Sequence, residues 1–227
     1  MSKLVLIKAA TKYLEILSQK GCDVEVSNDF PSIPEIAKET GRGYQLPTFD
    51  VARVDHTQRS TFWLFLLKDG QRIGGVAATL QDIGDECASN YLRRVADSQY
   101  PNPNGSTLTS VSPIISADMK GKLGYIGELA VHPEHQGDRQ SLAAFMRLVQ
   151  VLALLEWDVD WTYGFIPDRH LKAVLSKQYG FCRFVPLAQT WREPVPEKRS
   201  SNEWWVAANK KELLWFFEAE CRCANIL

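Results

Sequence analysis

The stretch from Lys122 to Trp157 constrains the fold more than any other part of the chain. It begins with a β-like run, "KLGYIGELAV", and passes through a polar turn that contains Pro133 and Gly137. The helix pattern "SLAAFMRLVQVLALLEW" follows directly. Its apolar residues recur on one wide stripe, formed by Leu142, Phe145, Val149, Leu152 and Leu155. We therefore expect a strand, a turn and a core helix in direct succession.

The remaining sequence predicts further strands and helices around this unit. A helix is expected over the first 20 residues, followed to residue 60 by a loop-rich segment with one short helix near 32–39. Two β-prone runs flank Asp69-Gly70 and predict a hairpin over 61–83. We expect more strands over 160–167, 182–191 and 201–208, and helices over 168–181 and 210–222. In the helix over 168–181, Asp168 caps the start and Gly180 the end. This order describes an α/β mixed sheet with helices on its faces.

An excursion over 81–122 separates the hairpin from the next strand. Its first part, "DECASNYLRRVADSQY", has helical spacing, and its second part is loop-like. Long excursions in a compact domain are often functional, so we expect this segment to face a substrate. A surface loop without a role is the alternative.

Composition and charge narrow the class of protein. The 227 residues are 45% apolar and 23% charged, which fits one globular domain over 1–227 with an N-terminal helical and loop segment over 1–60. The formal net charge is -1 and the two signs are interleaved, so neither nucleic acid nor a membrane surface is an expected partner. Leu4, Ile7, Leu14 and Leu17 recur at helical spacing, which favours a surface helix over a signal sequence.

The cysteines and histidines give no strong metal or disulfide pattern. Five widely spaced cysteines favour a reducing, cytoplasmic location over a disulfide framework. Cys221 and Cys223 form a C-x-C in which the side chains point to different faces. His132 and His135 flank Pro133 and have no obvious third ligand. We therefore expect no metal.

The turn before the long helix has the geometry of an anion site. A strand that ends in a glycine-containing turn and opens a helix leaves backbone N–H groups unpaired above the helix N-terminus. Many such turns bind nothing, and spacing alone does not decide between the two. Asp138 is unexpected here, because a carboxylate stands where an anion would bind.

The segment "LAVHPEHQGDRQSLAAFMRL" resembles the acyl-CoA signature of the GNAT superfamily of N-acyltransferases. Leu129, Val131 and Pro133 match the end of the family's strand, Gln136 and Gly137 stand where many members have Arg-Gly, and Ser141 holds the final small position. "LSKQYGF" resembles a second family motif, with Gly180 and Phe181 in place. The resemblance covers roughly residues 60–207 and implies one domain with a mixed, largely antiparallel sheet flanked by helices. The residues it implies for acyl-CoA binding are Leu129, Ala130, Val131, Gln136, Gly137, Asp138, Arg139, Gln140 and Ser141.

Two positions depart from the family's pattern. Arg139 replaces the middle glycine, and the tyrosine that often protonates the leaving thiolate falls at Ser176, with Tyr179 three residues later. Arg139 would still offer its backbone N–H and a charge that compensates Asp138. Asp138 is then either the ion partner of Arg139 or a helix N-terminal charge stabilised by the helix dipole. The rival interpretation is that the phosphate site has decayed.

Acyl transfer to an amine needs a base, an oxyanion donor and an acid. Glu128 is the candidate base, because a carboxylate within "GYIGELAV" would be desolvated and its pKa raised; a buried structural acceptor is the alternative. The resemblance implies a backbone N–H near Val131 as the oxyanion donor. Tyr179 and Ser176 compete as the acid. His170 is an auxiliary base or a surface histidine. The late tryptophans would line an acceptor or acyl pocket, or belong to the core or to a homodimer contact (Trp191, Trp204, Trp205 and Trp215).

The function expected from these residues is transfer of an acyl group, acetyl first, from acetyl-CoA or another acyl-CoA to the amine of a small molecule or protein. The fold also hosts acyl-homoserine-lactone and N-acyl amino acid synthases that use acyl carrier protein, and the excursion over 81–122 would suit them. A Trp-rich segment before the first strand, which those enzymes carry, is missing from the first 50 residues. A catalytically silent binding domain is the third hypothesis, supported by Arg139 and Ser176.

Overall fold

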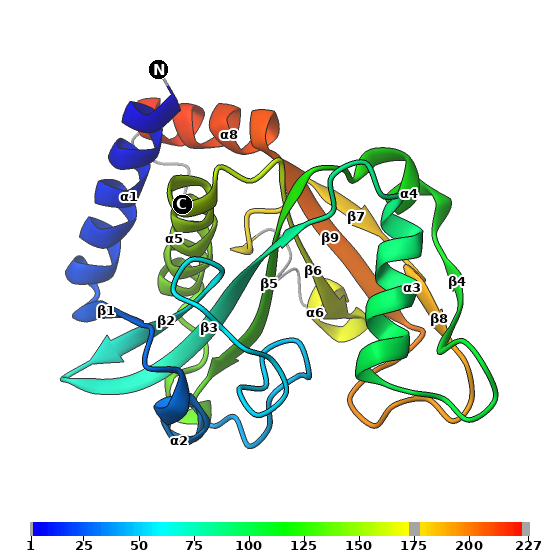
Figure 1. Ribbon diagram of the computed structural model, residues 1–227. Coiled ribbons are helices and arrows are strands. Elements are labelled where there is room, and N and C mark those ends of the chain that lie inside the picture. The colour runs from blue at the N-terminus through cyan, green and yellow to red at the C-terminus, as the bar shows by residue number, and fades with distance from the viewer. Residues whose placement is uncertain (1, 173–177, 224–227) are drawn as a thin grey trace.

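A seven-stranded sheet crosses the molecule in the computed structural model, which describes residues 2–172 and 178–223 (Figure 1). The strand order is β1-β2-β3-β5-β6-β9-β7, and β5 and β6 are its parallel pair while the other recorded pairs are antiparallel. The strands are β1 (Cys22–Ser27), β2 (Thr61–Lys68), β3 (Gln71–Asp82), β5 (Lys122–Val131), β6 (Trp161–Pro167), β7 (Arg183–Val185) and β9 (Glu203–Asn209). The mixed, largely antiparallel sheet predicted from the sequence is confirmed.

Helices and a second small sheet complete the fold. β4 (Leu108–Val111) and β8 (Gln189–Trp191) pair antiparallel with each other at one end of the molecule (Figure 1). The helical segments are α1 (Ser2–Gln19), η1 (Phe30–Ser32), α2 (Ile33–Glu39), α3 (Ala88–Gln99), α4 (Pro113–Asp118), η2 (Pro133–His135), α5 (Arg139–Trp157), α6 (Asp168–Lys172) and α8 (Lys210–Arg222).

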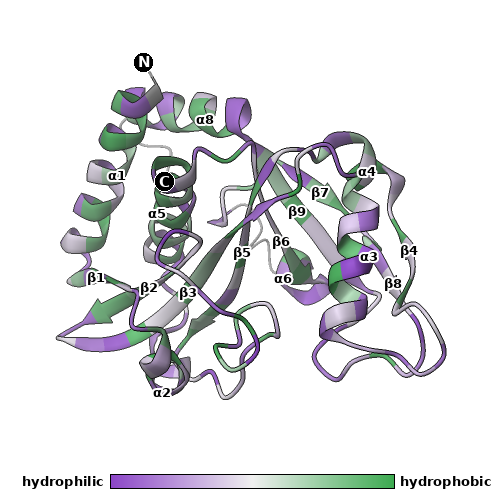
Figure 2. Ribbon diagram, in the orientation of Figure 1, coloured by the Kyte–Doolittle hydropathy of each residue, from purple (hydrophilic) through white to green (hydrophobic). Residues whose placement is uncertain are grey.

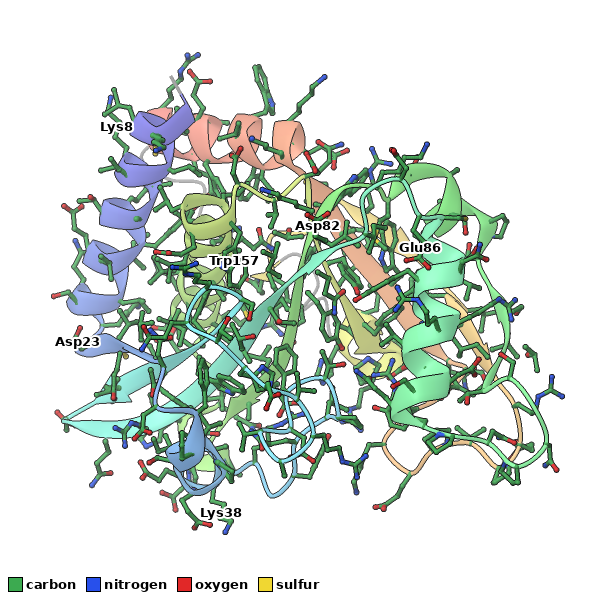
Figure 3. The ribbon with its side chains drawn as sticks, in the orientation of Figure 1. Lys8, Asp23, Lys38, Asp82, Glu86 and Trp157 are labelled. Carbon is green, nitrogen blue, oxygen red and sulfur yellow. The ribbon has the colours of Figure 1, made fainter. Side chains whose placement is uncertain are left out.

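The two faces of the sheet bury separate hydrophobic clusters because successive side chains of a strand point to opposite faces. On β2, Phe62, Leu64 and Leu66 pack in the cluster with α1, α5 and α8, while Trp63 and Phe65 pack in the other. The second cluster includes residues of α3 and α4. The sheet is therefore covered on both faces, and α5, which packs in the first cluster, is among the most hydrophobic helices in Figure 2. Charged side chains such as Lys8 and Lys38 point outward from this core (Figure 3).

Local sequence signals account for the main boundaries. Asp69 and Gly70 both have positive φ (50° and 75°), as a two-residue hairpin turn requires, and β2 and β3 flank them. β5 ends at Val131 and α5 begins at Arg139, as the strand, turn and helix pattern predicts. Gly180 has φ of 75°, the left-handed conformation that commonly ends a helix. Residues 173–177 of the helix expected over 168–181 lie outside the described part of the chain.

Four details differ from the sequence predictions. β1 forms within the segment expected to be loop, and it pairs with β2 along its whole length. α1 turns Leu6, Ala9, Tyr13 and Leu17 inward, so Leu4, Ile7 and Leu14 of the expected stripe are exposed. The expected strand over 182–191 is two short strands, β7 and β8, in different sheets. The excursion contains β4 and α4 after its helix α3.

No helix within the described ranges is long and apolar enough to span a bilayer. The five cysteines are free thiols, and four of them are exposed (Cys87, Cys182, Cys221 and Cys223).

Candidate functional site

The parallel strands β5 and β6 pair over only three residues and then separate. The recorded register ends at Tyr125 opposite Tyr163, although β5 continues to Val131 and β6 to Pro167. A cavity of about 180 Å³ occupies the resulting fork and is lined by both strands. β3 and β9 hold the outer edges of the two strands, so the fork is fixed by the sheet on either side.

A β-bulge places Glu128 beside this fork. The register between β3 and β5 shifts where Ala77 faces Gly127 and Gly75 faces Ala130, which leaves Glu128 in an irregular part of the ladder. Glu128 has φ of 62°, a left-handed conformation that costs a residue other than glycine of order 1–3 kcal/mol. Such strain persists only where surrounding contacts fix it, and here an ion pair does so.

Arg42 holds the Glu128 carboxylate with two bonds. Arg42 Nε lies 2.5 Å from Oε2 and Nη2 lies 2.9 Å from Oε1, and the Leu46 backbone N–H donates to Oε1 at 2.9 Å. The exposed fractions of the two side chains are 12% for Arg42 and 3% for Glu128. Burial raises the pKa of Glu128, and Arg42 and the Leu46 N–H oppose the rise.

Arg42 and Leu46 come from the segment between α2 and β2, which is anchored nearby. Phe49 stacks on Tyr125 with ring centroids 5.5 Å apart. A Cβ on Gly127 would lie 2.6 Å from the Phe49 ring, so glycine is required for this approach. The sequence analysis missed Arg42, because nothing in a loop-rich segment some 86 residues away links it to Glu128.

The turn between β5 and α5 shows what Asp138 does. Asp138 is the N-cap of α5: Oδ1 accepts from the backbone N–H groups of Gln140 and Ser141 at 3.1 Å, and Oδ2 accepts from Ser141 Oγ at 2.7 Å. Partial burial would raise the pKa of Asp138, but the bonds from Ser141 and Gln140, together with the charge of Lys20, outweigh it and lower the pKa. Of the two expected roles for Asp138, the helix N-terminal charge is the one observed. Among the described residues no ion pair joins it to Arg139, which is exposed.

A larger cavity of about 660 Å³ opens beside this turn. Seven of the nine residues expected to bind acyl-CoA line it (Leu129, Ala130, Val131, Gln136, Gly137, Asp138 and Ser141), whereas Arg139 and Gln140 do not. Lys20, Cys22 and Lys68, from α1, β1 and β2 or their ends, line the cavity as well and were not expected. Gly137 has φ of 109°, which the turn requires of a glycine.

The cavities fit the two halves of an acyl-CoA unequally. The fork and the large cavity share Leu129, Arg169, His170 and Tyr179, so an extended thioester arm would have a continuous path. The pyrophosphate would meet a helix end at which two of the first N–H groups already bind the Asp138 carboxylate. The path fits the arm of the donor better than the turn fits its phosphates.

Tyr179 stands where the two cavities meet. Its Oη lies 3.2 Å from His170 Nδ1, and its exposed fraction is 2%. Burial raises the pKa of Tyr179 to about 12 and lowers the pKa of His170. Ser176, the competing candidate, lies outside the described residues.

A third, narrow chamber of about 40 Å³ extends the fork toward the excursion. It shares Leu46, Tyr125, Phe165 and Arg199 with the fork, and its walls include Tyr91, Leu92, Val95, Ala96, Gln99 and Tyr100 from α3 and the residue that follows it, and Trp191 from β8. Trp191 is the late tryptophan that lines a cavity. Trp205 is buried in the core, Trp204 donates to Asp168 at 3.0 Å, and Trp215 is exposed.

Comparison with known proteins gives structural likeness only. No protein-family model matches the chain, and no curated protein matches it in sequence. Polyamine N-acetyltransferase of Drosophila melanogaster, which catalyses formation of N-acetylagmatine, has a TM-score of 0.50 over 82% of this chain and 100% of that one, at 10% identity. FeeM, an N-acyl amino acid synthase from uncultured soil microbes, has a TM-score of 0.49 at 13% identity over 85% and 92%. The aminoglycoside acetyltransferase AAC(6')-Ib with coenzyme A and kanamycin has 0.49 at 10% identity over 87% and 99%.

The parallel β5–β6 pair, its place in the strand order and the likeness to the fold of the polyamine N-acetyltransferase agree with one another. The chain has the fold of the GNAT superfamily of N-acyltransferases.

Proposed function

We propose that this protein is an N-acyltransferase that moves an acyl group from an acyl thioester, with acetyl-CoA as the first donor to test, to the amine of an acceptor. The observation that carries the proposal is the fork between β5 and β6, with the buried Glu128 carboxylate on its wall and Tyr179 at its junction with the larger cavity. A catalytic acid and base on the two sides of one path are what amine acylation requires. A cytoplasmic location suits the five free thiols and the thioester donor.

In the proposed reaction Glu128 takes a proton from the acceptor ammonium, and the free amine attacks the thioester carbonyl carbon. A backbone N–H of β5 near Val131 stabilises the oxyanion while the C–N bond forms. The C–S bond then breaks, and Tyr179 donates its proton to the departing thiolate. The nitrogen gives up its second ammonium-derived proton as the amide forms, and His170, which is bonded to the Tyr179 hydroxyl, is placed to relay that proton to Tyr179, while Glu128 releases the first one. The products are an amide, a thiol and one proton released to solvent.

Glu128 has to act as a base while Arg42 is bound to it. Burial favours the neutral form of Glu128 and the ion pair favours the carboxylate form. Burial is the stronger influence, so the pKa of Glu128 is raised, and Arg42 limits the rise. An acceptor that approaches Glu128 would share the carboxylate with Arg42 or displace one of its two bonds.

The test is turnover of Glu128→Gln with an acceptor that the wild type acylates. Loss of a general base lowers kcat by on the order of 10²-fold, with the largest deficit below the pKa of the acceptor ammonium and above that of Glu128, where the acceptor is protonated and the wild-type base is ionised. Glu25→Gln is the matched control, because Glu25 pairs with Arg72 at 2.8 Å far from the fork and its loss leaves kcat unchanged. Unchanged kcat in Glu128→Gln, with wild-type folding, would remove Glu128 as the base.

A catalytically silent binding domain is the second candidate, favoured by the same contacts. The Glu128 carboxylate is fully bonded, and the Asp138 carboxylate occupies the helix end. A donor carried by acyl carrier protein is the variant of the enzyme proposal that the Asp138 cap favours, because its phosphopantetheine arm has no pyrophosphate. Binding of a thioester without transfer to any amine would support the silent domain.

A further inference from the structure

Cations gather around the fork between β5 and β6. The charged residues that line this cavity are Arg42, Arg169, Lys198 and Arg199 against Glu128 and Glu203, a formal charge of +2 with His170 neutral. The four cations come from three segments of the chain: the segment after α2, helix α6, and two consecutive positions in the loop between β8 and β9. An excess of one sign in a partly enclosed cavity raises the local concentration of the opposite charge.

Both carboxylates are already paired with arginines within this wall, Glu128 by hydrogen bonds and Glu203 as an ion pair whose Oε2 accepts no hydrogen bond among the described residues. Glu128 is held by Arg42, and Glu203 Oε2 lies 3.0 Å from Arg199 Nη2 with exposed side-chain fractions of 7% for Arg199 and 10% for Glu203. A polycationic acceptor would have to compete with a buried arginine for each carboxylate, and breaking a buried ion pair is costly. The fork is therefore poorly suited to polyamines or aminoglycosides.

Tyr44 brings two of the cations together at the opening. The Arg42 guanidinium carbon lies 4.5 Å and the Lys198 Nζ lies 5.0 Å from the centroid of the same ring, whose residue is 43% exposed. Lys198 also pairs with Glu197, but that side chain is 83% exposed, and exposed pairs contribute little. Arg169 is exposed, and no ion pair is recorded for it within the described ranges. We call Arg42, Lys198 and Arg169 the cationic rim.

Arg199 lines both the fork and the narrow chamber, and one of its nitrogen donors has no hydrogen-bond partner among the described residues. Its guanidinium stacks over Phe165 at 5.5 Å and over Trp191 at 5.0 Å. Its buried Nε has no hydrogen-bond partner among the described residues. Buried polar groups are usually satisfied, so an unpaired donor on a cavity wall indicates a polar ligand atom nearby.

We infer that the acceptor is a small amine that also carries a carboxylate, the class to which free amino acids belong. The inference rests on the proposed function, since it assigns the acceptor of that same site. The acceptor carboxylate lies among the cations of the rim, the ammonium group reaches Glu128, and the side chain points toward the chamber beyond Phe165 and Arg199. Lys198 is the rim cation that we test, because its partner Glu197 is exposed and its Nζ lies over the same Tyr44 ring as the Arg42 guanidinium.

The experiment compares matched acceptors by calorimetry on the full-length protein. Each of several amino acids is titrated beside its amide and its decarboxylated amine, with spermidine as a polycation. Amino acids are expected to bind about tenfold tighter than their amides, because a charge-assisted bond is lost with the carboxylate, and the difference shrinks at high salt. Equal binding of acid and amide, or tighter binding of spermidine, would overturn the inference.

Lys198 variants locate the recognised group. Lys198→Met keeps the stem over Tyr44 and removes the charge, so it should abolish most of the preference for the acid over the amide, and Lys198→Arg should restore it. Lys211→Met, an exposed lysine on α8 away from the fork, is the matched control and should change nothing. If Lys198→Met weakened binding of an acidic carrier protein and left the amino acids unaffected, the rim would serve the donor and the inference would be wrong.

Binding and transfer together separate this inference from the proposed function. Amino acids that bind through Lys198 without being acylated by any donor would support the amino acid site, defeat the enzyme proposal and overturn the assignment of these amino acids as acceptors. Acylation of simple alkylamines by a protein that binds no amino acid would do the reverse. Absence of amino acid binding at millimolar concentration overturns the inference in either case.

Discussion

At the residue scale, Asp138 stabilises the start of α5 and at the same time occupies N–H groups that could bind an anion. Its carboxylate bonds to two N–H groups that a phosphate would otherwise use, and it places a negative charge at the positive end of the α5 dipole. The same residue lines the larger cavity. Stability of α5 and affinity for a phosphate are therefore opposed at one side chain.

Replacing Asp138 with Asn should tighten donor binding while slightly weakening the fold. Asn remains a good N-cap, so the loss of stability should stay below about 1 kcal/mol. Removing a like charge near the phosphates should improve affinity for coenzyme A by about fivefold, as a Coulomb interaction of order 1 kcal/mol allows. Calorimetry and urea unfolding measure the two effects. Glu134→Gln is the control, since Glu134 lines the same cavity without capping α5.

The stability difference between wild type and Asp138→Asn should also depend on pH. The pKa of Asp138 is lowered in the folded state, so its contribution is present above its unfolded pKa of about 4 and is lost as the pH falls through the lower folded value. The two proteins should thus converge in stability in strong acid. Equal affinity for coenzyme A in both would mean that the phosphates do not approach the start of α5.

Replacing Tyr179 with Phe tests the proposed acid through the leaving group. With an ordinary alkyl thioester, loss of the hydroxyl should lower kcat by on the order of 10²-fold, because the thiolate departs unprotonated. With an aryl thioester, whose thiolate leaves readily, the deficit should nearly vanish. A similar deficit with both donors would assign Tyr179 a packing role and leave the acid unassigned.

At the element scale, three helices are joined by a buried polar cluster behind the sheet. Tyr13 of α1 donates to Glu220 Oε2 of α8 at 2.6 Å, and Arg147 Nη1 of α5 lies 3.2 Å from Glu220 Oε1. The exposed side-chain fractions are 7% for Arg147 and 1% for Glu220. Arg147 also stacks over the Phe216 ring at 5.0 Å. α5, which carries the turn beside the large cavity, is thereby tied to both ends of the chain.

Glu220→Gln should destabilise the protein by about 3 kcal/mol, because it leaves Arg147 charged and buried without an anion. The double variant with Arg147→Met should recover at least half of that loss, since the unpaired charge is gone. Guanidinium unfolding measures both. Glu218→Gln, which breaks only an exposed pair with Arg222 on the same helix, should cost less than about 0.5 kcal/mol. A double variant no more stable than Glu220→Gln would contradict this account.

The sequence predicts elements whose signals are local and misses those that depend on partners. Asp69-Gly70 specifies its own turn, and the strand, turn and helix of 122–157 follow from periodicity. β1 has no such signal, because its pairing with β2 decides its conformation. Glu128 and Tyr179 could be chosen as candidates from sequence; both are buried and line the fork, and their catalytic roles stay predictions. Arg42, Arg199 and Tyr44 could not, since only tertiary structure brings their loops to the fork.

At the scale of the whole molecule, the three cavities adjoin one another through shared lining residues. The large cavity meets the fork at Tyr179 and His170, and the fork meets the chamber at Tyr125 and Phe165. In the proposed reaction the phosphate end of a donor lies near α5, and the acceptor lies in the fork with its side chain toward α3 and β8. Donor and acceptor binding should therefore stabilise different parts of one fold.

Thermal unfolding with donor fragments should separate these parts. A ligand at 100 times its dissociation constant adds about 2.7 kcal/mol to stability, which corresponds to a rise in Tm of roughly 5–10 °C for a chain of this size. Because the Asp138 cap disfavours the pyrophosphate, acetyl-phosphopantetheine and acetyl-CoA at equal concentration should give Tm values within about 3 °C of each other. A shift with acetyl-CoA alone would show that the nucleotide half supplies most of the affinity.

Helix α3 and strand β8 of the small β4–β8 sheet line the chamber. Neither lines the large cavity beside the turn between β5 and α5. Changes in these two segments can therefore alter which acceptor fits while the donor arm keeps its path. The donor side and the acceptor side of the molecule can therefore be altered separately, with the fork as the division between them. Engineering a new acceptor preference should start with residues 88–111 and 189–202 and leave β5 and α5 intact.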